Sequence, residues 1–193
     1  MDILGINSSA DNVFIKHSSA DKCWMIGEEI HEDIVHILVD PATIQTGWGI
    51  YEGGYNWVWD EKPGVSKGQP SSDYKRAFSI WIYSKEHGSK IWRRFSWGEG
   101  QGFNNLCSTF WNDIKANEGK VVHVKYTGAT VEKFKVGQAA IPLFEFVKWT
   151  EKPAEFASYD MDMPMEQAIE EANNSFDFAE PSPKPTTEDD LPF

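Results

Sequence analysis

The sequence predicts a mainly β fold, a small Greek-key barrel that carries one helix and continues into a disordered acidic tail. Eight segments show the two-residue alternation or the β-branched and aromatic enrichment of strands. All nine tryptophans lie between Trp24 and Trp149. The 43 residues that follow position 150 contain 12 acidic side chains and only 2 basic ones. We therefore expect a folded domain over residues 1–150 and a flexible tail over residues 151–193.

The predicted strands cover residues 12–17, 23–26, 34–39, 78–84, 90–97, 121–126, 131–136 and 141–149. A helix is predicted over residues 103–117, because its apolar residues recur at the three- and four-residue spacing of a helix face, and Gly119 gives a stop signal. Thr127-Gly128 is predicted to turn the following hairpin. One helix before the last strands is typical of the OB-fold, with residues 43–74 as an insertion, and a β-sandwich with a covering helix fits almost as well.

The net charge of −12 suggests at first that nucleic acid is not a ligand. However, residues 62–125 contain 11 basic and only 5 acidic side chains. Charges more than roughly 8–10 Å away are screened at cellular salt, so a polyanion responds to this local surplus. No apolar run approaches the ~20 residues of a membrane span, and a signal-peptide pattern is missing, so we expect a cytoplasmic protein. Cys23 and Cys107 are expected to be reduced.

Two predicted central strands carry large side chains on the face opposite the expected core. In 78–84, alternation assigns Phe78, Ile80 and Ile82 to the core. It assigns Trp81 and Tyr83 to the other face. In 90–97, Trp92 and Arg94 are expected to face a ligand, while Arg93 falls in the apolar set. Lys75-Arg76 precede these strands. Exposed rings between cations suit single-stranded nucleic acid, since bases stack on rings and cations neutralise phosphates.

A second aromatic cluster surrounds Gly53-Gly54, which predicts a hairpin turn. Trp48 lies before the turn. Tyr55, Trp57 and Trp59 come after it and share one face. The polar, Gly/Pro-rich stretch 62–72 is predicted to be mobile. Two interpretations remain equal: the hairpin and loop close over a bound strand, or the hairpin packs on the barrel. The full set of predicted DNA-binding residues is Trp48, Tyr55, Trp57, Trp59, Lys75, Arg76, Trp81, Tyr83, Trp92 and Arg94.

No pattern predicts catalysis, a metal site or a cofactor. The glycines of 98–102 resemble a dinucleotide fingerprint, but Phe103 occupies the sixth position, and a flexible connection between strand and helix explains them better. The five histidines lack metal-binding spacings. The acidic stretch 28–33 is interpreted as a solvated turn rather than an ion site. We expect a protein without enzymatic activity.

The chain ends in Glu188-Asp189-Asp190-Leu191-Pro192-Phe193. This ending resembles the acidic tip of bacterial single-stranded DNA-binding proteins, which finishes Asp-Asp-Ile-Pro-Phe, with Leu191 in place of Ile. The whole layout is most similar to the compact versions that tailed phages encode, although the Gly/Gln-rich linker of bacterial members is missing. The resemblance implies coating of single-stranded DNA in replication, recombination and repair, in the host cytoplasm if a phage encodes the chain.

The resemblance also implies that Asp189, Asp190, Leu191, Pro192 and Phe193 recruit replication and recombination proteins. The acidic tail beside the basic central segment suggests that the tip competes with DNA for the binding surface. A homo-oligomer is compatible with the sequence. Two other classes remain: a carbohydrate-binding β-sandwich, which also uses exposed rings, and a nucleotide-dependent enzyme built on residues 98–102.

Overall fold

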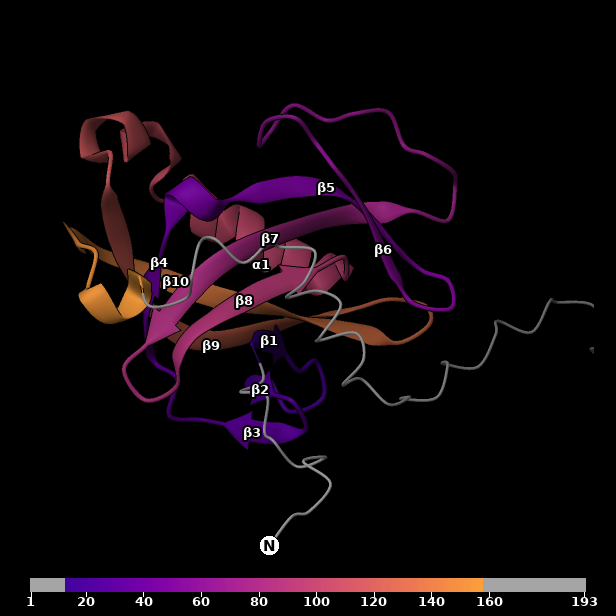
Figure 1. Ribbon diagram of the computed structural model, residues 1–193. Coiled ribbons are helices and arrows are strands. Elements are labelled where there is room, and N and C mark those ends of the chain that lie inside the picture. The colour runs from indigo at the N-terminus through magenta and orange to yellow at the C-terminus, as the bar shows by residue number, and fades with distance from the viewer. Residues whose placement is uncertain (1–12, 158–193) are drawn as a thin grey trace, which may run out of the picture.

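The structure is a computed structural model that describes residues 13–157, and these residues form a mainly β body around one α-helix (Figure 1). The described residues contain ten strands: β1 (Phe14–His17), β2 (Trp24–Ile26), β3 (Glu29–His31), β4 (His36–Val39), β5 (Gln45–Tyr51), β6 (Tyr55–Trp59), β7 (Lys75–Ser84), β8 (Gly88–Arg94), β9 (Lys120–Lys133) and β10 (Gln138–Glu151). The helices are α1 (Trp97–Ser108) and the short 3₁₀ turns η1 (Pro41–Thr43), η2 (Trp111–Asn117) and η3 (Ala154–Ala157).

All ten strands belong to one mixed sheet. Its main path runs β10-β9-β4-β7-β8-β1-β2-β3, and β5 pairs with both β7 and β6. Strand β1 runs parallel to β8, and the other pairs are antiparallel. The predicted β-rich body is confirmed. In the described residues the sheet is not closed into a barrel, because β8 pairs with β7 and β1 and does not pair with β10.

Helix α1 lies against the inner face of the sheet and completes the core. Phe103, Leu106 and Cys107 are buried on its inner side. Phe103 stacks on Phe78 of β7 with ring centroids 4.2 Å apart, so the helix contacts the face that alternation assigned to the core. Cys107 is a free thiol, as is Cys23 elsewhere in the core.

The N-terminal strands cover the opening between β8 and the β9–β10 pair, at one end of the molecule (Figure 1). Trp24 of β2 is 1% exposed and meets Trp92 of β8 with ring centroids 5.3 Å apart. It also contacts Tyr126 of β9 and Phe144 of β10. Side-chain packing by Trp24 thus closes the structure where backbone pairing does not.

A buried carboxylate, Glu99, joins three parts of the fold. It accepts hydrogen bonds from the backbone N–H of His17 in β1 (2.8 Å) and from the indole N–H of Trp92 in β8 (3.1 Å). The Ser96 hydroxyl donates a third (2.7 Å), and the guanidinium of Arg94 lies 3.1 Å away. Buried charges are stable only when they are paired and hydrogen-bonded, and Glu99 satisfies both requirements.

Helix α1 begins at Trp97, six residues before the predicted start, and ends at Ser108, nine residues before the predicted end. Ser96 at the N-cap and Glu99 have the S-x-x-E spacing of a capping box, a start signal that the apolar periodicity did not reveal, but here the Ser96 hydroxyl donates to the Glu99 carboxylate instead of capping a backbone N–H. At the other end the Thr109 hydroxyl donates to the carbonyl of Leu106 (2.8 Å). The chain then continues as the separate turn η2 rather than as one long helix.

The glycines of the 98–102 segment belong to this helix and let it approach β10. A Cβ atom on Gly98 would lie 2.4 Å from the carbonyl oxygen of Ala140. A Cβ on Gly102 would lie 2.4 Å from Cγ of Pro142. The predicted flexible connection is therefore wrong. Gly98 and Gly102, four residues apart, serve the close packing of this helix on β10.

Strands β9 and β10 form one long hairpin, and the turn predicted at Thr127-Gly128 is a β-bulge within β9. Tyr126 pairs with Phe144 and Gly128 with Leu143, which leaves Thr127 as the extra residue. Gly128 has φ +109°, a conformation that favours glycine. The actual turn spans residues 134–137, where the N–H of Phe134 donates to the carbonyl of Gly137 (3.1 Å).

The first residues of the predicted tail pack on the body. Lys152 Nζ lies 2.6 Å from Asp40 Oδ2, and Phe156 is buried against Tyr83. The remainder of the tail, including the predicted docking residues Asp189 to Phe193, lies outside the described residues. Among residues 13–157, no helix has both the length and the apolar character needed to span a bilayer.

We predict that Glu99→Ala lowers the free energy of unfolding by about 3–5 kcal/mol, because it leaves the Arg94 cation and two N–H donors without their acceptor. Urea unfolding of the full chain measures this. Glu118→Ala is the matched control, since Glu118 is exposed, and it should change the value by less than about 0.5 kcal/mol. Equal losses in the two variants would contradict the role given to Glu99.

Candidate functional site

The outer face of the sheet carries a row of parallel rings on the edge strand β6. Tyr55 and Trp57 have centroids 5.8 Å apart and planes 12° apart. Trp57 and Trp59 have centroids 5.5 Å apart and planes 6° apart. Phe95, just after β8, contacts both Tyr55 and Trp57. We call Tyr55, Trp57, Trp59 and Phe95 the aromatic platform. Its four residues are half-buried, so the platform is partly open to solvent.

Two glycines of β5 form the floor under this platform. The pairs Gly47–Trp59 and Gly49–Trp57 lie directly opposite each other in the β5–β6 ladder. A Cβ on Gly49 would lie 2.7 Å from the Trp57 ring and 2.9 Å from Phe95, and one on Gly47 would lie 2.4 Å from the Val58 carbonyl oxygen. The rings lie flat on the sheet because these two positions have no side chain. The hairpin predicted at Gly53-Gly54 and the shared face of its rings are confirmed.

A buried cation, Arg93 of β8, lies against the platform. Its guanidinium carbon is 5.7 Å from the centroid of the Trp57 ring and 5.2 Å from that of Trp59, and Phe14 of β1 flanks it at 5.7 Å. Its Nε donates to the Ser79 hydroxyl (3.1 Å). Burial lowers the pKa of Arg93 to about 10, so the side chain stays charged at neutral pH. Cation–π attraction of this kind holds rings in place and puts positive charge beside them.

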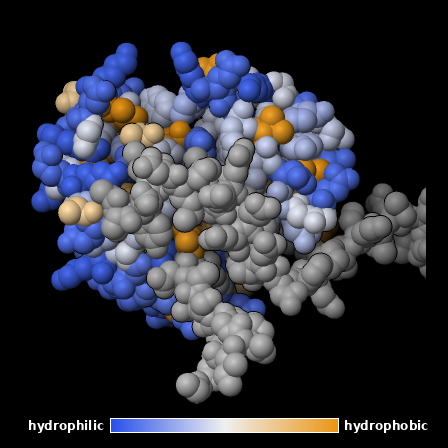
Figure 2. Space-filling view, viewed as in Figure 1, coloured by the Kyte–Doolittle hydropathy of each residue, from blue (hydrophilic) through white to orange (hydrophobic). Residues whose placement is uncertain are grey.

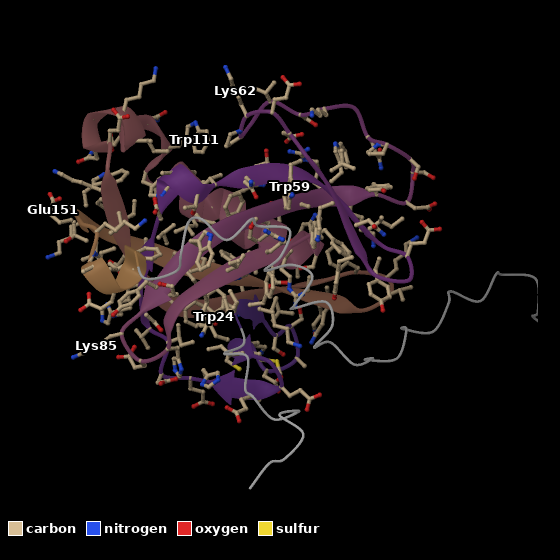
Figure 3. All side chains as sticks on the ribbon, in the orientation of Figure 1. Trp24, Trp59, Lys62, Lys85, Trp111 and Glu151 are labelled. Carbon is tan, nitrogen blue, oxygen red and sulfur yellow. The ribbon has the colours of Figure 1, made fainter. Side chains whose placement is uncertain are left out.

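Lys75 adds an exposed cation on the same face. It pairs with Gly49, which pairs with Trp57, and directly opposed residues in a ladder point to the same side. Glu52 lies in the hairpin turn, three residues before Tyr55, and is an exposed acidic side chain. Figure 3 shows Trp59 in the region of the β5–β6 hairpin, apart from Trp111 on η2. On the part of the surface that Figure 2 displays in colour, apolar residues form small separate spots among hydrophilic ones.

Trp48 and Arg76, which were predicted to bind DNA, lie on the opposite face of β5 and β7 from the platform. The Arg76 guanidinium stands over the Trp48 ring at 4.9 Å and pairs with Asp60 (2.8 Å). Asp60 also accepts from the Thr46 hydroxyl (2.6 Å) and the Lys67 backbone N–H (2.9 Å). The loop predicted to be mobile is therefore held at Asp60. The positive charge of Arg76 is already paired with the carboxylate of Asp60.

Trp92 does not face a ligand, and that part of the prediction is wrong. Trp92 is 1% exposed in the core, where it contacts Phe78 and Phe103. Arg94 points to the same side and pairs with Glu99. Arg93 and Arg94 therefore lie on the faces opposite to those predicted. The physical cause is the carboxylate of Glu99, which draws Arg94 inward and leaves Arg93 on the outer face.

Trp81 and Tyr83 do lie on the outer face, but at the other end of β7. Both are half-buried. Tyr83 stacks on Phe156 of η3 with centroids 5.7 Å apart, so the returning chain covers it in part. Six residues separate Lys75 from Trp81, about 20 Å along a strand. The structure therefore brings together Tyr55, Trp57, Trp59 and Lys75 of the predicted set and keeps Trp81 and Tyr83 apart from them.

Arg93 and Phe95 belong to the site and were missed as ligand-facing residues. Alternation cannot assign faces in β8, because residues Ser89 to Arg93 are all buried and both faces of the strand are covered. The S-x-x-E spacing at 96–99 was a signal for the start of a helix, but it does not tell which face of β8 Arg94 takes. Trp97, which is 46% exposed, contacts Phe134 of the β9–β10 turn at 5.1 Å and offers a second ring pair beyond Phe95.

A pH titration tests the Asp60 cluster. Burial alone would raise the pKa of Asp60, but hydrogen bonds from Arg76, Thr46 and Lys67 lower it to about 2. The folded pKa is below the unfolded value of about 3.9, so the contribution of this carboxylate to stability is present above pH ~4 and is lost as the pH falls towards 2. In Arg76→Ala the pKa of Asp60, measured by NMR, should rise to about 4 or higher.

Lys75→Ala is the matched control for this titration, because it removes the neighbouring cation from the opposite face. It should leave the pKa of Asp60 near 2. An equal rise in both variants would mean that general positive charge, and not the paired guanidinium, holds the carboxylate ionised.

Comparison with models of protein families, with curated proteins and with solved structures gave no match to this chain.

Proposed function

We propose that this protein binds single-stranded DNA by stacking bases on the aromatic platform, and that it coats exposed strands in replication, recombination and repair without catalysing a reaction. One observation carries the proposal. Three parallel rings, Tyr55, Trp57 and Trp59, lie partly open on an edge strand with the buried Arg93 cation against them. A platform of this kind accepts any base, because every base has a flat π-face.

The strand order supports an OB-like interpretation of the body. If β4 and β5 are counted as the first strand, then β7, β8, β9 and β10 follow as strands two to five, and α1 falls between strands three and four. An OB-fold is a five-stranded, partly open Greek-key barrel. It binds oligonucleotides on the face of strands two and three and through the loops after strands one and four.

The aromatic platform coincides with that expected face. Arg93 and Phe95 lie in and just after β8, the counterpart of strand three, and the rings of β6 belong to the connection between strands one and two. The β9–β10 turn, the counterpart of the other loop, contributes Phe134 beside Trp97. The contacts of Phe95 with the rings of β6 and the contact of Trp97 with Phe134 suggest a continuous stacking track from Tyr55 towards Phe134.

The end of the chain supports a second part of the proposal. The acidic run closing in Leu191-Pro192-Phe193 suits docking to replication and recombination proteins, with Phe193 as an apolar anchor. Such a protein would act in the cytoplasm, of the host cell if a phage encodes it.

Binding of a labelled dT oligonucleotide, followed by fluorescence anisotropy at several salt concentrations, tests the proposal. Trp57→Ala and Trp59→Ala should each weaken binding roughly 5- to 150-fold, because stacking contributes about 1–3 kcal/mol per base. Trp111→Ala is the matched control: Trp111 is 43% exposed on η2, away from Trp59 in Figure 3, and its removal should change affinity by less than about twofold.

Wild-type affinity should fall linearly with salt on logarithmic axes, since bound phosphates release counterions. A neutral oligosaccharide serves as the competing ligand, because stacked rings also bind sugars. Tight, salt-independent binding of the oligosaccharide, or equal losses in the Trp57 and Trp111 variants, would overturn the assignment.

A further inference from the structure

Two histidines and a carboxylate converge where the N-terminal strands meet the turn between β7 and β8. His31 ends β3, Asp33 follows in the connection to β4, and His87 lies in the turn. The rings of His31 and His87 have centroids 4.3 Å apart. His87 Nε2 lies 2.9 Å from Asp33 Oδ2, and His31 Nδ1 lies 3.9 Å from Asp33 Oδ1. One ligand atom from each residue falls within 4.8 Å of the other two.

We propose that His31, Asp33 and His87 bind one divalent transition-metal ion, of which Zn²⁺ is the best fit. Imidazole nitrogens and a carboxylate oxygen are ligands that Zn²⁺ takes at about 2.0–2.2 Å, with four ligands in a tetrahedron. Ligand atoms at that distance stand about 3.3–3.5 Å apart. The observed separations lie on both sides of this value, so small rotations of three side chains would complete the site.

The surroundings of these three side chains favour metal binding. Both imidazoles are largely covered, with side chains 16% and 20% exposed, while Asp33 is 52% exposed and leaves a path for the ion. Glu29 Oε2 lies 3.9 Å from His31 Nε2, the ring nitrogen that does not face Asp33, and adds negative charge beside the site.

A bound ion would fasten the N-terminal strands to the body. Strand β3 ends the sheet and pairs only with β2 among the described strands. Strand β1 pairs with β8 through two residue pairs, Phe14–Ile91 and Ile15–Trp92. A metal held by His31 and His87 would add a direct link between β3 and the β7–β8 turn, which Lys85 marks in Figure 3. The site therefore has a structural role that does not depend on the proposed DNA binding.

Metal-stripped full-length protein is titrated with ZnCl₂ by calorimetry, and thermal unfolding is recorded with and without the ion. We expect one Zn²⁺ per chain and a rise in Tm of about 5–10 °C at a free Zn²⁺ concentration a hundred times Kd. Co²⁺ at the same site should give the visible absorption of a four-coordinate N/O complex. Asp33→Asn and His87→Gln should each weaken binding at least tenfold and abolish the Tm rise.

The second histidine pair provides the control. His36 Nδ1 and His123 Nε2 lie 3.0 Å apart on β4 and β9, and among residues 13–157 no carboxylate joins them in a metal-binding group, so the double variant His36→Gln/His123→Gln should keep both the stoichiometry and the Tm rise. Retention of Zn²⁺ binding in His87→Gln, or its loss in the His36/His123 variant, would overturn the proposal. The dT affinity of His87→Gln should equal that of wild type, which separates this test from that of the aromatic platform.

Discussion

The buried carboxylate of Glu99 is the interaction on which the rest of the structure depends. It accepts hydrogen bonds from β1, from Trp92 of β8 and from the N-cap of α1. A single charged group therefore fixes the N-terminal strand, the central strand and the helix relative to one another. It also sets the orientation of β8: with Arg94 drawn inward to Glu99, neighbouring Arg93 must face outward. The position of the Arg93 cation beside the aromatic platform is therefore a consequence of the buried pair between Glu99 and Arg94.

The aromatic platform depends equally on two positions of β5 that have no side chain. Gly47 and Gly49 leave no Cβ atoms beneath Trp59 and Trp57, and the two rings lie parallel and close to the sheet. Large rings on an edge strand would ordinarily pack into a core or onto a neighbouring element. Here glycine below and Arg93 alongside hold them flat while the residues stay partly open to solvent. Such a preorganised surface loses little conformational entropy when a planar ligand stacks on it.

Patterns that depend on one strand or one turn were predictable from the sequence. The hairpin at Gly53-Gly54, the shared face of Tyr55, Trp57 and Trp59, and the core face of β7 all followed from two-residue alternation and turn chemistry. Features set by long-range partners were not. Alternation failed in β8 because both of its faces are covered, and the turn at Thr127-Gly128 proved to be a bulge because β10 supplies a partner on both sides of it. The pairing of Arg76 with Asp60 likewise joins residues 16 positions apart.

Photocrosslinking of a dT oligonucleotide carrying 5-iodouracil to the wild-type protein, with the crosslinked residues identified by mass spectrometry, tests the central claim most directly. The account predicts crosslinks to Tyr55, Trp57 or Trp59 on β6, with Phe95 as the next contact. Crosslinks confined to Trp48, Trp111 or other residues away from the outer face would contradict it.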